Sequence, residues 1–286
     1  MRIAARSILL LLLGVSVLST GCVQQTKTTP IATSNETKPS KNLMPMIFAA
    51  AALKKTRNAA KSYKEKDYEN AEKNCQQQFI LLDKVDLDAF KAKSPAKLKS
   101  DLLLIRASCL EILGKIAGVR KDWRQAITFH AESLQHINEG SALTPERITW
   151  DELRGNAYWS LAGAYQHNKD FDKVREFVLL TQEISKKLIT LSKQPFKWRA
   201  INLIANWELK RENFQQHLTR DFVEDVANYQ LMVDEIEKEA KAYREQASGN
   251  EKGLKYADVL DQIVRKFQSR LKKIYNKDNF DLRIAS

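Results

Sequence analysis

Histidines, cysteines and paired carboxylates build most catalytic and metal sites, so they are the first side chains to place. The chain has four widely spaced histidines, His130, His136, His167 and His217. It contains no HExxH motif, no glycine-rich phosphate loop and no Gly-x-Ser-x-Gly motif. We therefore expect no catalytic residue, no metal and no cofactor. A helical enzyme whose carboxylates come from distant positions would show no such motif and stays open as an alternative.

The N-terminus of the chain has the pattern of an export signal. Arg2 and Arg6 precede an apolar run at residues 8–17, and small residues at 19–21 lead to Cys22. A charged start, an apolar centre and a small-residue exit are typical of a secretory signal. The apolar run is too short for a membrane-spanning helix. An uncleaved anchor is the alternative interpretation.

The segment that ends at Cys22 resembles the bacterial lipobox. In that family the cysteine is lipidated and becomes the first residue of the mature protein, which a membrane then holds. The common pattern has an aliphatic residue three positions before the cysteine, where this chain has Ser19, with Leu18 one step earlier. The resemblance favours the outer membrane, facing the periplasm, because Val23 and not aspartate follows the cysteine.

Residues 23–42 are composed of polar residues and proline, with almost nothing that could enter a core. This composition predicts a flexible tether, which would span on the order of 25 Å root-mean-square. Removing residues 1–22 takes away two arginines and no acids, so the net charge falls from +12 to +10. The folded body is expected to begin near Leu43.

The body is predicted to be all-α. The whole chain has only 9 glycines and 6 prolines, and apolar residues recur at helical spacing with no convincing alternating run. Four prolines stand fifty residues apart, at Pro45, Pro95, Pro145 and Pro195. Ser94 and Thr144 precede two of these prolines and are expected to cap helices whose first residue is proline.

A second marker alternates with the prolines and predicts the turns of helical hairpins. It is a polar pair followed by an aromatic residue, as in Lys66-Asp67-Tyr68, Lys121-Asp122-Trp123, Lys169-Asp170-Phe171 and the looser Glu212-Asn213-Phe214. We expect each aromatic residue to enter the second helix of a hairpin. The alternative is a helical bundle with aromatic turns.

Two of these units resemble the tetratricopeptide repeat. The pattern of large residues, a small residue and a later alanine or valine is carried by Leu110, Leu113, Gly114, Ala117, Trp123 and Ala126, and by Tyr158, Leu161, Ala162, Tyr165, Phe171 and Val174. Units one and four match only at the turn, at Tyr68 with Ala71 and at Phe214 with His217. The resemblance implies a right-handed solenoid of hairpins over residues 43–217.

The same resemblance implies that a partner lies along the face made by the first helix of each hairpin. Transferring that register gives Glu111, Lys115, Asn156, Trp159, Gln166, Arg199, Asn202 and Asn206. Trp159 is the best single anchor. The alternative is that Trp159 is itself a core residue and that Tyr158 beside it is wrongly assigned as the packing residue. The expected function is a membrane-anchored adaptor that binds another envelope protein. A helical envelope enzyme or a cell-wall- or carbohydrate-binding lipoprotein is the alternative.

Residues 218–286 are predicted to form a C-terminal pair of antiparallel helices. Residues 218–247 have a net charge of −4 and residues 252–277 a net charge of +6, so we expect opposite charges to face each other. The basic helix could instead bind a partner. Residues 23–100 have a net charge of +7, which suits anionic lipid or an acidic cell-wall polymer, or only a solvated surface. Nucleic acid is not an expected partner.

Two cysteines remain in the mature chain, Cys75 and Cys109. In a tetratricopeptide stack their helices would pack together, and an oxidising periplasm makes a disulfide worth testing. Two small buried thiols are the alternative interpretation.

Overall fold

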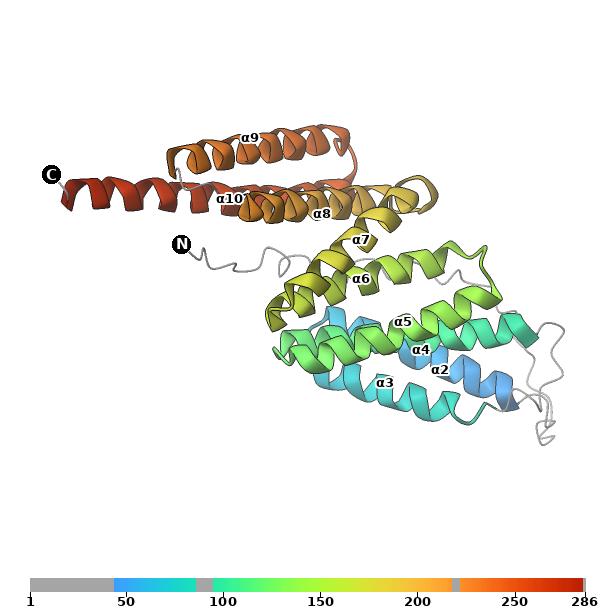
Figure 1. Ribbon diagram of the computed structural model, residues 1–286. Helices are drawn as coiled ribbons and strands as arrows, with labels where there is room; N and C mark the ends of the chain where they lie inside the picture. The colour runs from blue at the N-terminus through green and yellow to red at the C-terminus, as the bar shows by residue number, and fades with distance from the viewer. Residues whose placement is uncertain (1–43, 86–94, 218–221, 285–286) are drawn as a thin grey trace. The chain divides into compact units, whose positions relative to one another are not determined.

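The computed structural model describes residues 44–85, 95–217 and 222–284, and every regular element in these ranges is an α-helix (Figure 1). The all-α prediction is confirmed. Cys22 and residues 23–42, predicted as the anchor and the tether, lie outside the described residues. The helices are α2 (Met44–Lys64), α3 (Tyr68–Leu82), α4 (Pro95–Val119), α5 (Trp123–Leu143), α6 (Ile148–Asn168), α7 (Phe171–Leu191), α8 (Pro195–Gln216), α9 (Phe222–Gln246) and α10 (Glu251–Ile284).

The helices pack as two units that divide between Lys169 and Asp170. We call α2–α6 the N-terminal unit and α7–α10 the C-terminal unit. The division falls inside the range 43–217 that the sequence assigned to one series of hairpins.

Three turns of the chain share one backbone geometry. Lys66, Lys121 and Lys169 each adopt a left-handed conformation, with φ of 62°, 65° and 62°. The aspartate that follows each lysine accepts a hydrogen bond from the backbone N–H three residues later and so caps the next helix. The Lys-Asp-aromatic pattern thus ends one helix and starts another with only two or three residues between them.

Helix α4 lies at the centre of the N-terminal unit. It contacts α2, α3, α5 and α6, and from residue 107 to residue 117 only Ser108 is not buried. The first turns in Figure 1, α2–α3 and α4–α5, lie at the same end of this unit, as alternating antiparallel helices require. The segment 107–117 is enclosed by the neighbouring helices, so the charged residues on it, Glu111 and Lys115, must find partners inside the unit.

One proline marker has a different role from the one expected. Thr144 does not cap α6, which begins at Ile148 with Arg147 in the cap position. Thr144 ends α5 instead, and its hydroxyl accepts a hydrogen bond of 3.0 Å from the Trp150 indole N–H. Ser100 lies 2.6 Å from the same hydroxyl. The Thr144 hydroxyl therefore links the end of α5 to α4 and α6.

The C-terminal unit consists of two packed helix pairs, α7 with α8 and α9 with α10. The turn predicted at Glu212-Asn213-Phe214 is wrong, because α8 continues through these residues to Gln216. Without a left-handed residue and an aspartate cap, the local sequence does not stop the helix. Figure 1 shows α9 and α10 side by side, joined by the short turn at residues 247–250.

One ion-pair network between α9 and α10 runs in the reverse of the expected sense. Arg244 of α9 binds Asp258 at 2.6 Å and Asp261 at 2.7 Å, so a base on the acidic helix pairs with acids on the basic helix. Apolar packing accompanies these pairs, since Ile236 and Tyr243 are buried on α9 and Leu260 and Phe267 on α10. Burial of these side chains is the larger contribution to the register, because exposed ion pairs contribute little.

Candidate functional site

A cluster of charged side chains lies buried between α4 and α5. The Glu111 carboxylate lies 2.9 Å from Nδ1 of His130, and its second oxygen is 4.0 Å from the ammonium of Lys115. The three residues are 3%, 2% and 9% exposed. We call Glu111, Lys115 and His130 the α4–α5 charge cluster.

Helical spacing and one glycine make room for this cluster. Glu111 and Lys115 are four residues apart on α4, so both point toward the same side. Gly114 lies between them, and a Cβ at this position would come within 2.6 Å of the His130 ring. Glycine is therefore required here by the close approach of the imidazole to the helix backbone. On α5, Ser133 donates a hydrogen bond of 3.0 Å to the Ala107 carbonyl and holds the second helix in register.

The electrostatics of the cluster oppose its burial. Burial alone raises the pKa of Glu111, but His130, then Lys115 and Ser133 outweigh it, so the pKa is lowered overall. Burial lowers the pKa of Lys115, with Glu111 opposing the shift. The carboxylate is thus kept ionised by its neighbours. One of its oxygens, Oε2, accepts no hydrogen bond and relies on the Lys115 charge at 4.0 Å.

The α4–α5 charge cluster has the residue types of an acid–base site but no opening to solvent. A general base must come within hydrogen-bond reach of a substrate proton, and the packed helices around α4 leave no such approach in this conformation. What the arrangement can do is fix the two helices relative to each other, since shifting either one would strip Glu111 of its partners. No local sequence motif marks this cluster, because Glu111 and His130 are 19 residues apart.

Two of the other histidines also contact groups of the protein itself. The His167 ring stacks on Trp123 with centroids 3.8 Å apart, and burial lowers its pKa. His217 Nδ1 lies 2.8 Å from the Asn213 carbonyl oxygen. Among the described residues no group of three histidine, cysteine, aspartate or glutamate side chains could hold a metal ion.

The three partner-binding residues predicted on α6 lie at different depths. Trp159 and Gln166 are 1% and 6% exposed, and neither the indole N–H nor the Gln166 amide oxygen has a hydrogen-bond partner. Asn156 is half-buried. A partner cannot touch Trp159 in this conformation, so its role as an anchor stays a prediction that requires α6 to be uncovered.

The three residues predicted on α8 make contacts within the C-terminal unit. Asn206 accepts a hydrogen bond from Gln182 of α7, and Asn202 accepts one of 3.2 Å from Ser185. Arg199 donates a hydrogen bond of 3.3 Å to Gln246 of α9. The three residues predicted to bind a partner thus form hydrogen bonds to neighbouring helices of their own unit.

A second buried ion pair was not foreseen from the sequence. Arg211 of α8 contacts Glu208 through Nε at 2.9 Å, and the two residues are 8% and 4% exposed. The other oxygen of Glu208 has no hydrogen-bond partner. Their spacing of three residues is common on solvated helices, so only burial distinguishes this pair from an ordinary surface pair.

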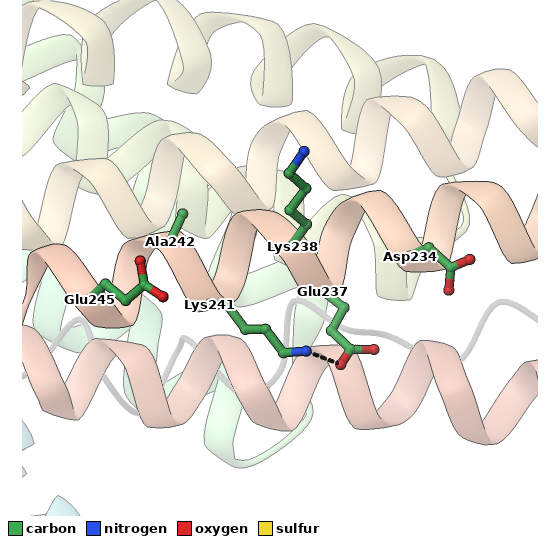
Figure 2. A pocket seen from close by; sticks show the side chains of 6 residues that line it. All are labelled: Asp234, Glu237, Lys238, Lys241, Ala242 and Glu245. Carbon is green, nitrogen blue, oxygen red and sulfur yellow. Dashed lines mark ion pairs between the residues drawn. The ribbon is translucent and has the colours of Figure 1, made fainter.

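A surface hollow lined by described residues runs along α9. It has a volume of about 560 Å³ and is lined by Asp234, Glu237, Lys238, Lys241, Ala242 and Glu245. Figure 2 shows these side chains along one helix, with Lys241 paired to Glu237 at 2.9 Å. Three acids and two lysines line it without converging on a point, which gives the hollow no preference for one ligand charge.

Comparisons of the chain with protein-family models, with curated proteins and with solved structures gave no match. No helix in the described part of the chain is long and apolar enough to cross a membrane.

Proposed function

We propose that the chain is a lipid-anchored adaptor of the bacterial cell envelope, which binds another envelope protein through its helical body. The anchor is Cys22, and the expected position is the periplasmic face of the outer membrane. The protein performs no chemistry of its own and acts by holding its partner near the membrane.

The repeated turn is the observation that carries the proposal. Three helix ends use a left-handed lysine followed by a capping aspartate, and each starts the next helix with an aromatic residue. Such a recurrence supports a series of helical hairpins related to tetratricopeptide repeats, which serve in protein binding. The resemblance of Leu18–Cys22 to a lipobox supports the anchor. The enclosed position of the α4–α5 charge cluster supports a role without catalysis.

Membrane attachment is tested with Cys22→Ser. The variant should leave the membrane fraction or accumulate as unprocessed precursor, because lipidation needs the thiol. Ser19→Leu is the matched control, since it brings the segment closer to the common lipobox pattern and should be processed normally. Normal processing of Cys22→Ser with unchanged membrane attachment would remove the anchor from the proposal.

Partner binding is tested by photo-crosslinking in cells. Ile80 on α3 and Leu231 on α9 are 56% and 66% exposed, so a photoreactive residue at either position should not disturb the core. We expect an adduct of defined mass with another envelope protein from at least one position. Leu11→Arg interrupts the apolar run of the signal, and with this change the adduct should disappear. No adduct from either position, or the same adduct without export, would contradict the adaptor function.

A further inference from the structure

The two cysteines of the mature chain meet in the core of the N-terminal unit. The chain contains three cysteines, and Cys22 is the one assigned to the anchor. Cys75 comes from α3 and Cys109 from α4, 34 residues later, and both are 0% exposed. They belong to one apolar cluster with Ala71 and Ile112. We infer that Cys75 and Cys109 form a disulfide when the protein folds outside the cytoplasm, which rests on the proposed export of the chain.

The contacts of the two thiols support this pairing. The Cys75 Sγ atom lies 3.7 Å from the Cys109 carbonyl oxygen, and the Cys109 thiol points toward the Thr56 hydroxyl at 3.5 Å. The pKa of Cys75 is raised first by a hydrogen bond with the Cys109 side chain and then by burial. A disulfide needs sulfurs at about 2.05 Å, a separation that rotations about the two Cα–Cβ bonds would have to reach.

The burial of the two thiols indicates that they are oxidised during folding and not afterwards. A thiolate is the species that attacks a disulfide, and the raised pKa of the buried Cys75 thiol suppresses it in the folded protein. The thiols are also closed to an oxidant at 0% exposure. Oxidation therefore belongs to the folding chain, before α3 is covered by α4.

The reaction balances with a disulfide oxidant of the compartment, either a protein dithiol carrier in its oxidised form or glutathione disulfide. One thiolate of the pair attacks the oxidant's disulfide and forms a mixed disulfide. The second thiolate then displaces the oxidant's remaining sulfur. The chain loses two electrons and two protons, and the oxidant leaves as two thiols. The product ties hairpin α2–α3 to α4 and closes a loop of the intervening residues, which constrains the unfolded chain.

The state of the thiols is measured by counting mass tags from a maleimide under denaturing conditions. The full chain isolated from the envelope should take no tag at Cys75 and Cys109 before reduction and two tags after it. Peptide mapping without reductant should recover one linked pair of peptides. Cys75→Ser should take one tag with or without reductant. Two tags on the unreduced wild-type chain recovered from the envelope would overturn the inference.

A second arm separates this inference from the proposed export. The full chain with Leu11→Arg and Cys22→Ser stays in the cytoplasm and should carry two free thiols. Unfolded and refolded with glutathione disulfide, it should lose both tags and give the same linked peptides. If refolding leaves both thiols free, the pairing fails whatever the location of the protein. If refolding links them but the wild-type protein is cytoplasmic, the pairing stands and the proposed export fails.

Discussion

Two charge networks, one in each unit, lie at very different depths. In the N-terminal unit, Glu111 and His130 join α4 to α5 with side chains 4% and 2% exposed. In the C-terminal unit, Lys210 joins α8 to α9 through Glu235 at 2.7 Å and Glu239 at 3.1 Å, with side chains between 30% and 57% exposed. The distances between the charged atoms are similar in the two networks, so the networks differ mainly in how deeply their side chains are buried. A buried charge cannot turn to water when its partner moves, whereas an exposed one can, and the buried cluster therefore dictates how its helices pack.

The largest effect is expected from Glu111→Ala. Removing the carboxylate leaves Lys115 enclosed without a counter-charge and His130 without its partner at Nδ1, and the free energy of unfolding should fall by about 3–5 kcal/mol. Glu235→Ala is the control from the exposed network, where Lys210 keeps Glu239, and should cost less than about 1 kcal/mol. Urea denaturation followed by circular dichroism measures both. Equal losses would show that depth does not separate the two networks.

Acid should weaken the α4–α5 charge cluster in a defined direction. The pKa of Glu111 is lowered in the folded protein, below the value of about 4.3 that glutamate has when unfolded. Its contribution is therefore complete well above pH 4.3 and is lost as the pH falls through the folded pKa. The difference in unfolding free energy between the wild type and Glu111→Gln should shrink as the pH is lowered from 7 to below 4. A difference that stays constant would contradict the assigned ionisation.

Gly114→Ala tests the space that the cluster needs. The new Cβ would lie 2.6 Å from the His130 ring, so the helices must shift and the free energy of unfolding should fall by about 1–3 kcal/mol. Gly118→Ala is the matched control on the same helix, where the nearest ring atom, on Trp123, is 3.5 Å away. The control should be neutral or slightly stabilising because alanine favours the helix. Equal melting of the two variants would mean that the register of α4 against α5 is different.

The smallest effect is expected in the turn that joins these helices. Lys121 has φ of 65°, which costs an L-residue more than glycine. Lys121→Gly should therefore stabilise the protein by at most about 1 kcal/mol, while Lys121→Ala should change almost nothing. Thermal melting of the two variants gives the comparison. Destabilisation by glycine would show that the lysine side chain itself supports the turn.

The helical class and most helix ends could be read from the sequence because local chemistry determines them. Pro95 and Pro195 stand at the first residue of α4 and α8, and three Lys-Asp-aromatic turns lie where the marker predicted. The fourth marker failed because Glu212-Asn213 lacks both the left-handed residue and the capping aspartate. The role of Thr144 could not be foreseen either, since its partners Ser100 and Trp150 come from other helices.

The candidate site was less predictable than the fold because polarity alone does not report exposure. The tetratricopeptide register places Glu111 and Lys115 on a face open to a partner, and charged residues usually meet solvent, yet both lie in the interior. The burial of these two charges depends on His130, which contacts Glu111 but is 19 residues away in the sequence. Asn202 and Asn206 follow the same logic, because amides suited to a peptide are equally suited to Ser185 and Gln182 of a neighbouring helix.

The central position of α4 also has a consequence for how the chain is made. A chain that emerges N-terminus first presents α4 before the two helices that follow it, α5 and α6, have appeared. During that interval α2 and α3 can cover one side of α4, but the side that packs on α5 and α6 is uncovered, and the Glu111 carboxylate lacks His130. The stretch from residue 95 to residue 168 must therefore be handled as one piece, and a pause in synthesis or translocation inside it would offer chaperones and proteases their best target.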